Sequence, residues 1–330
     1  MTLGEKLPPR RGGGVLRIGA AAIGLTIASF SCPAHAADVV IGVPAWPSAQ
    51  VTAHIIADTL KDRLGIETEL RERGTLTILS EVGRGNIQVH PEVWLPNLTD
   101  LVEKLAEQEK VLRLSPHGVA ATQNICATRE TLDQTGIKAV ADLAKPEMAA
   151  KFDSDGDGKG EIWIGAPTWS STEIEKIRAH SYGYDRTMTL LEMPEDVAMA
   201  GVDAAVSLGR PIVFYCYGPH HVFQLHDVVM LEEPPYDPSR WTLVKRAEDS
   251  AWLEKSHADT AWDASEFHVA YAASLETERP DAASFLSAIE LGPEDITAMS
   301  YAVVVEGRPV EDVAKDWIAQ NEDRIGEWTK

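Results

Sequence analysis

Four aromatic residues occupy the same kind of position at distant points of the chain. They are Trp46 in VVIGVPAW, Trp94 in NIQVHPEVW, Trp169 in EIWIGAPTW and Tyr217 in RPIVFYCYGP. Each segment begins like a β-strand and carries a proline within three residues of its aromatic ring. Because ligands bind beyond the carboxyl ends of strands in open α/β sheets, we expect the four rings to converge on one cleft.

A cage of aromatic ring faces suits a quaternary or tertiary ammonium group. Such a cation has no strong N–H donors and its methyl groups are apolar, so ring faces supply both the negative potential and the apolar contact. Each ring contributes roughly 0.5–2 kcal/mol when the contact is desolvated. Glu92 lies two residues before Trp94 and is the predicted anionic partner. The alternative for Glu92 is an ordinary surface or ion-paired carboxylate.

The residues after Trp169 offer a complementary site for an anion. Ser170, Ser171 and Thr172 open a predicted helix, and their backbone N–H groups lie at its positive end. They are predicted to receive a carboxylate or an N-oxide oxygen. Most tryptophans pack rather than bind ligand. Of the other tryptophans, we expect packing at Trp163, Trp241, Trp252, Trp317 and Trp328, and keep Trp262 as a further candidate.

The segment DSDGDGKGE matches the first half of an EF-hand loop, with Gly158 at the sharp bend of position six. Position twelve is Ile164 rather than the usual glutamate. We predict a structural Ca²⁺ that holds the strand leading to Trp169 and does not touch the solute. The alternative is an Asp/Gly turn without metal. The predicted ligands are Asp153, Asp155, Asp157, Lys159 (through its carbonyl) and Glu161.

Enzyme and nucleic-acid signatures are missing from the sequence. It contains no G-x-S-x-G, P-loop or G-x-G-x-x-G pattern, and no nucleophile–base pair stands out. The adjacent His220 and His221 lack partners at zinc-site spacing, which favours a packing or surface role. The net charge of −21 argues against a nucleic-acid partner. We therefore predict a protein that is not an enzyme and binds no organic cofactor.

The elements that position these residues alternate between strand and helix. Strand 39–43, a helix capped by Ser48 and ended by Gly65, and strand 66–70 make a β-α-β start, which predicts a parallel sheet. Further expected helices are 77–83, 98–108, 140–143, 172–182, 197–208 and 310–328. Further expected strands are 87–89, 161–164, 211–215, 228–231 and 265–274. The alternation of strand and helix changes near residues 118–125, which predicts a second α/β lobe. This lobe II, at 123–235, is inserted between two parts of lobe I, at 37–122 and 236–330.

Residues 1–36 have the pattern of a cleaved signal peptide. A basic flank precedes the apolar run 18–30, and Ala34-His35-Ala36 is an A-x-A cleavage site. The mature chain is therefore predicted to be periplasmic, with a lipid anchor at Cys32 as a minor alternative. Cys126 and Cys216 then remain, and export permits a disulfide between them. Two buried free thiols are an equally good interpretation of the sequence.

Three blocks of the chain resemble a known family in the same order. They are HPEVWLPN, FDSDGDGKGEIWIGAPTW with its Ser/Thr/Glu helix start, and PIVFYCYGPHH. They resemble the glycine-betaine/proline-betaine-binding proteins of ABC importers, and the resemblance covers residues 39–328. It implies an α/β type II periplasmic binding-protein fold, with two α/β lobes joined by a hinge and the ligand cleft between them.

The resemblance also implies roles for single residues. Trp94 and Trp169 match the family's cage tryptophans, and Tyr217 takes the third cage position, where the family's well-known member has tryptophan. The N–H groups of Ser170 and Ser171 match the site that holds the betaine carboxylate.

The block VPAWPSA is closer to a branch that resembles trimethylamine N-oxide-binding proteins, which implies Trp46 and Glu92 as further pocket members. We therefore predict a monomeric binding protein that delivers glycine betaine or trimethylamine N-oxide to an inner-membrane ABC permease with its ATPase subunit. Choline or another methylated amine is the alternative solute. Two alternatives belong to other classes of protein function. They are a calcium-stabilised secreted enzyme acting on methylated amines and a chemosensory module.

Overall fold

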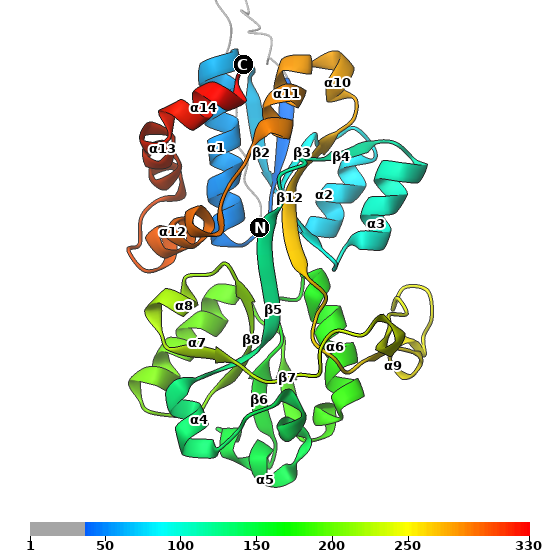
Figure 1. Cartoon of the computed structure of the whole chain (residues 1–330), viewed down its shortest axis with the longest axis vertical. Coiled ribbons are helices and arrows are strands. Elements are labelled where there is room, and N and C mark those ends of the chain that lie inside the picture. Colours follow the sequence, from blue (N-terminus) through cyan, green and yellow to red (C-terminus); the bar gives the residue numbers. More distant parts are fainter. Residues whose placement is uncertain (1–36) are drawn as a thin grey trace, which may run out of the picture. The chain divides into compact units, whose positions relative to one another are not determined.

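A computed structural model describes residues 37–330, which form one compact unit. The predicted signal peptide, residues 1–36, lies outside the described residues. Within 37–330, no helix combines the length and apolar character needed to cross a bilayer. Two α/β lobes share a ten-stranded mixed sheet, which confirms the predicted fold class (Figure 1).

The sheet has the strand order β2-β1-β3-β12-β5-β8-β6-β7, with β4 paired to β12 and β9 paired to β5. β1 is parallel to β2 and β3, as the β-α-β start predicts, and β6 is parallel to β7 and β8. The strands are β1 Val39–Val43, β2 Thr68–Glu72, β3 Val89–Leu95, β4 Leu112–Leu114, β5 Val119–Thr128, β6 Gly160–Trp163, β7 Met188–Leu191, β8 Val213–Gly218, β9 Val228–Met230 and β12 Ser265–Ala272. A separate pair joins β10 Trp241–Thr242 to β11 His257–Ala258.

Strand β5 connects the two lobes. Its first residues, 119–121, pair with β12, and residues 122–127 pair with β8. β12 in turn pairs with β3 of the first lobe. The two lobes therefore meet along β5, and the residues around its middle lie between them (Figure 1).

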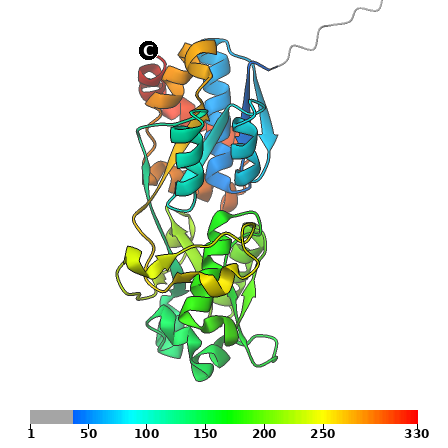
Figure 2. The same ribbon diagram turned by 90° about the vertical axis from the view of Figure 1, so that its right-hand side faces the viewer.

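Helices cover both faces of the first-lobe sheet (Figures 1 and 2). One core cluster joins β1 to α1 and to the C-terminal helices, and a second lies under α2 and α3. A third cluster, from Ile125 to Leu231, forms the core of the second lobe. The α-helices are α1 Pro47–Leu64, α2 Thr75–Val82, α3 Thr99–Glu103, α4 Arg129–Thr135, α5 Pro146–Ala149, α6 Ser170–Tyr182, α7 Glu195–Ser207, α8 Val222–Leu225, α9 Trp252–Lys255, α10 Leu275–Glu278, α11 Pro280–Ala288, α12 Pro293–Val304, α13 Val310–Gln320 and α14 Glu322–Trp328.

Several sequence-based expectations about local structure were wrong in detail. The helix expected at 310–328, for example, is divided into α13 and α14. α1 begins at Pro47, so Ser48 lies inside the helix and is not its cap, although Gly65 ends the helix as expected, at φ 66°. Proline at the first helical position is favoured because it lacks only an N–H that has no helical partner. The strand expected at 87–89 extends instead over Val89–Leu95. The helix expected at 98–108 splits into α3 and a π-helical turn, Lys104–Gln108.

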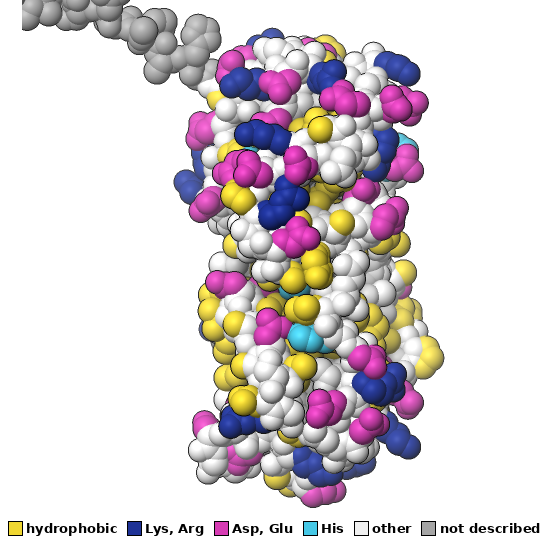
Figure 3. Space-filling model, turned by 90° about the vertical axis from the view of Figure 1, so that its left-hand side faces the viewer, with side chains coloured by type: hydrophobic (Ala, Val, Ile, Leu, Met, Phe, Trp, Pro, Cys, Tyr) yellow, Lys and Arg dark blue, Asp and Glu magenta, His cyan; other side chains and the backbone are white. Residues whose placement is uncertain are grey.

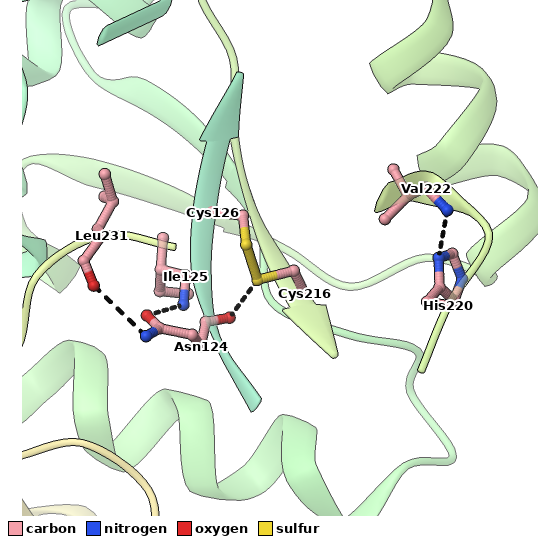
Figure 4. Close-up of a disulfide and its surroundings, with 7 residues drawn as sticks. All are labelled: Asn124, Ile125, Cys126, Cys216, His220, Val222 and Leu231. Carbon is pink, nitrogen blue, oxygen red and sulfur yellow. Dashed lines mark hydrogen bonds between the residues drawn. A yellow bond between two sulfur atoms is a disulfide. The ribbon is translucent and has the colours of Figure 1, made fainter. Parts of the chain in front are cut away.

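Cys126 and Cys216 form a disulfide, which decides between the two interpretations left open by the sequence. The sulfur atoms are 2.03 Å apart and the Cα atoms 5.7 Å apart. Figure 4 shows the bond joining β5 to β8, with Cys216 Sγ 3.3 Å from the Asn124 carbonyl oxygen. The link therefore fastens the strand that connects the lobes to the sheet of the second lobe.

Candidate solute-binding site

One cavity collects all the residues predicted to bind solute. The space between its lining atoms, open solvent included, amounts to about 420 Å³. Its predicted lining residues are Trp46, Glu92, Trp94, Trp169, Ser170, Ser171 and Tyr217. Sequence reasoning missed Thr75, Asn97, Leu98, Gln123 and Tyr215, which also line it. On the face shown in Figure 3, apolar side chains are frequent between the two lobes, whereas charged ones are more frequent above and below.

The four predicted aromatic rings stand edge to face around this cavity. Trp46 and Trp169 are 6.2 Å apart between centroids, with an interplanar angle of 87°. Trp169 and Tyr217 are 5.6 Å apart at 83°, and Tyr217 and Trp94 are 5.3 Å apart at 84°. Neighbouring rings are thus nearly perpendicular, so they form the walls of a box rather than a stack. Trp46 and Trp94 come from the first lobe, and Trp169 and Tyr217 from the second.

Further rings hold two of these walls in place. Trp94 stacks on Phe267 of β12, with centroids 4.7 Å apart and an angle of 28°. Trp169 packs against Trp163 at 5.6 Å, and the Trp163 indole N–H donates to the Met193 carbonyl at 3.0 Å. Trp163 therefore has the packing role predicted for it. Such pairs contribute about 0.5–1.5 kcal/mol beyond burial and fix ring orientation before a ligand arrives.

Glu92 is fully buried in β3, in contrast to an ordinary surface carboxylate. Its Oε2 accepts hydrogen bonds from the Trp46 indole N–H at 2.6 Å and the Ser48 hydroxyl at 3.2 Å. Its Oε1 is buried and has no hydrogen-bond partner among the described residues. Burial raises the pKa of Glu92 to about 7, although hydrogen bonds from neighbouring side chains, that of Trp46 first, act in the opposite direction. A cation in the cavity would therefore favour the ionised form.

The start of α6 presents backbone donors to the cavity. Trp169 occupies the N-cap position, and its side chain makes no capping bond. The first N–H groups of an α-helix have no partner within the helix, and here these belong to Ser170 and Ser171. The preceding turn is fixed because the Thr172 hydroxyl donates to the Ala166 carbonyl at 2.6 Å. The end of the helix is therefore free to accept an anionic group.

A polar network lies where β5 joins the lobes. The side-chain amides of Asn97 and Gln123 exchange two hydrogen bonds, of 2.9 and 2.8 Å. Gln123 also donates to the Ser265 hydroxyl at 2.9 Å and accepts from the Tyr215 hydroxyl at 2.8 Å. The network ties together β12, β5, β8 and the turn after β3. Isolated polar residues in strands form no sequence motif. The only signal for this network in the sequence was the change in the alternation of strand and helix patterns near residues 118–125.

The remaining candidate side chains lie outside the cavity. The Trp262 indole N–H donates to Glu175 at 2.9 Å, and the Arg178 guanidinium lies 5.7 Å from the Trp262 ring centroid. Trp241 packs against Trp262 at 5.3 Å. His220 and His221 are both buried, which agrees with a packing role rather than a surface one. Trp317 and Trp328 stack on each other at 5.8 Å.

The acidic loop lies immediately before β6, away from the cavity lining. Ligand oxygens of its Asp153, Asp155 and Asp157, together with one of Glu161 in β6, all lie within 4.8 Å of one another. Gly156 and Gly158 adopt φ values of 82° and 93°, which side chains disfavour. The Lys159 amide donates to Asp157 at 2.8 Å.

Two α/β lobes that place aromatic rings and a helix N-terminus around one cavity define the fold of the type II periplasmic binding proteins. A family model described as the substrate-binding domain of an ABC-type glycine betaine transport system matches residues 37–320. The chain belongs to this family, whose members are transport substrate-binding proteins. The resemblance seen in the sequence is thereby confirmed.

Characterised relatives share about a quarter of their residues or fewer with this chain. The glycine betaine/proline betaine-binding periplasmic protein of Escherichia coli K12 is 24% identical over 247 residues, covering 71% of this chain and 72% of that protein. The trimethylamine N-oxide-binding protein of Pelagibacter ubique is 22% identical over 318 residues, covering 94% and 97%.

Solved structures show the same fold. Lactococcal OpuAC, closed around glycine betaine, superposes with a TM-score of 0.68 at 17% identity, covering 88% of this chain and 99% of that one. A choline-binding protein in complex with choline gives a TM-score of 0.68 at 17% identity, covering 88% and 90%.

Proposed function

We propose that this chain captures a trimethylammonium solute, glycine betaine or trimethylamine N-oxide, in the periplasm for an ABC importer. The observation that carries the proposal is the box of perpendicular rings built from both lobes, with the buried Glu92 beside it. The family supports the class of function, and the named relatives support the choice of solutes.

The cavity offers separate partners for the two ends of such a solute. The methyl groups would contact the faces of Trp94, Trp169 and Tyr217, and the Glu92 carboxylate would balance the positive charge. The N–H groups of the α6 N-terminus would accept the carboxylate of glycine betaine or the oxygen of the N-oxide. Choline has a hydroxyl in place of this anionic group, so it would gain less from the helix end.

Closure of the two lobes would couple binding to delivery. Trp46 and Trp94 belong to one lobe and Trp169 and Tyr217 to the other, so a solute that touches all four makes more contacts when the lobes are together. Such differential contact shifts the population toward the closed state. The partners would be an inner-membrane permease and its ATPase subunit, which supplies the energy, and the binding protein would act as a monomer without catalysing a reaction.

We also propose that the acidic loop holds a structural Ca²⁺. The donor set consists of carboxylate oxygens, as this hard cation prefers, and Glu161 Oε1 is buried with no hydrogen-bond partner among the described residues. Bound there, the ion would offset the repulsion among Asp153, Asp155 and Asp157. It would stiffen the loop before β6 and hence the strand that leads to Trp169. It would not contact the solute.

Calorimetric titration of the mature protein with glycine betaine, trimethylamine N-oxide and choline tests the function. We expect a dissociation constant in the micromolar range or below for at least one of the first two, and weaker binding of choline. Absence of binding to all three would overturn the trimethylammonium proposal.

A further inference from the structure

Tyr217 differs from the three tryptophan walls of the box because it carries a hydroxyl, which lies behind its ring. The ring lines the cavity, and the hydroxyl donates a hydrogen bond to Glu195 Oε1. Glu195 does not line the solute cavity; it lines a small space behind the ring, together with His220. A tryptophan at this position would have no hydroxyl to make this bond.

Glu195 is itself held in one orientation. It is 7% exposed and occupies the first position of α7, where the helix dipole favours a negative charge. The same Oε1 accepts a second hydrogen bond, from His220 Nε2 at 2.9 Å. The Val222 amide donates to His220 Nδ1 at 3.1 Å, which places a proton on Nε2 (Figure 4). The His220 ring also packs edge to face against Tyr217 at 4.7 Å.

A phenol that donates to a carboxylate becomes richer in electrons over its ring. The pKa of Tyr217 is raised well above its ordinary value, mainly by burial, so the proton stays on the phenol and the ring is polarised rather than ionised. A more negative ring face attracts a cation more strongly, while its apolar contact with methyl groups is unchanged. The network therefore strengthens the attraction between the ring and the positive charge of the solute. It leaves the apolar contact, which depends on the shape of the solute, unchanged.

We propose that Glu195 is a positioning and specificity-determining residue that, with His220, orients and polarises Tyr217 so that the box prefers a methylated cation to an uncharged group of the same shape. This inference rests on the proposed function. Because Glu195 does not touch the solute, its effect passes through the Tyr217 hydroxyl. Removing either partner of that hydrogen bond should have the same consequence for binding.

The test uses solutes paired with isosteres in which carbon replaces the charged nitrogen. These pairs are trimethylamine N-oxide with tert-butanol, and glycine betaine with 3,3-dimethylbutanoate. Dissociation constants are measured for the wild type, Glu195→Gln, Tyr217→Phe and the double variant. Asp203→Asn is the matched control, because Asp203 lies on the same helix, pairs with His226 at 2.7 Å and does not line the cavity.

We expect Glu195→Gln and Tyr217→Phe each to weaken binding of the charged solute about three- to tenfold, and the isostere less than about twofold. The double variant should be no weaker than the weaker single variant, because both changes remove one interaction. Wild-type affinity in Tyr217→Phe, equal losses for solute and isostere, or additive losses would overturn the inference. Tyr217→Phe alone decides the question if Glu195→Gln does not fold. Failure of the wild type to bind any charged solute would instead overturn the proposed function and this inference together.

Discussion

The buried carboxyl of Glu92 predicts that solute affinity depends on pH near neutrality. Its pKa of about 7, against an ordinary value of 4.5, means that the empty protein holds a large protonated fraction at pH 6 and a small one at pH 8. A fixed cation in the box favours the carboxylate. If only the ionised form binds well, the dissociation constant falls about tenfold between pH 6 and pH 8.

The raised pKa of Glu92 also makes the stability of the empty protein depend on pH. Stability falls as the pH rises, whereas solute affinity increases. The folded pKa is raised, so the contribution of Glu92 to stability is fully present below pH 4.5 and is lost as the pH rises toward 7. The total loss of unfolding free energy amounts to about 3 kcal/mol. Solute should offset this loss, since it stabilises the ionised carboxylate. The melting temperature of the empty protein should therefore fall over this range more than that of the loaded protein.

Calorimetry in two buffers of different ionisation enthalpy measures both affinity and proton release. With glycine betaine, which has no group that titrates between pH 6 and pH 8, we expect about one proton released per solute bound at pH 6 and almost none at pH 8. Glu92→Gln is the control: it should bind roughly 30-fold or more weakly at pH 8 and lose the dependence on pH. A wild-type dissociation constant that is unchanged from pH 6 to pH 8 would refute the reasoning.

Three further predictions concern the cage, the metal and the disulfide. Trp169→Ala should weaken solute binding at least tenfold while circular dichroism stays unchanged, and an unaltered dissociation constant would remove Trp169 from the cage. A calcium chelator should lower the melting temperature of the wild type but not that of Asp155→Asn, without abolishing binding at low temperature; equal melting with and without chelator would count against the ion. Replacing Cys126 and Cys216 by alanine should lower the unfolding free energy by about 2–4 kcal/mol in denaturant titrations. No loss of stability would show that the link does not constrain the unfolded chain.

The clustering of the four aromatic rings could be predicted from sequence because its signals are local. An apolar run, a proline and an aromatic ring together mark a strand end, and strand ends of one sheet edge meet in space whatever their separation in the chain. Trp46, Trp94, Trp169 and Tyr217 all line the cavity for this reason. The depth of Glu92 was not foreseen, because the strand containing it is longer than its flanking residues indicate.

Contacts that depend on the register between strands far apart in the chain could not be predicted from the sequence. Cys126 pairs with Cys216 because β5 and β8 lie side by side in a particular register, across 90 residues of chain. The amide pair of Asn97 and Gln123 likewise forms only once both lobes are built. Glu195 carries no local signal either, since its hydrogen-bond partner is a tyrosine on another element. Each of these contacts requires the assembled fold.

Proton NMR of the bound solute tests the central claim most directly. The nine methyl protons of glycine betaine or trimethylamine N-oxide give a single signal. In a box of ring faces this signal should move upfield and show Overhauser contacts to indole protons of Trp94 and Trp169. Those contacts should disappear in the corresponding alanine variants. Binding without an upfield shift or an indole contact would show that the trimethylammonium group lies elsewhere, and would contradict the aromatic cage as the site of recognition.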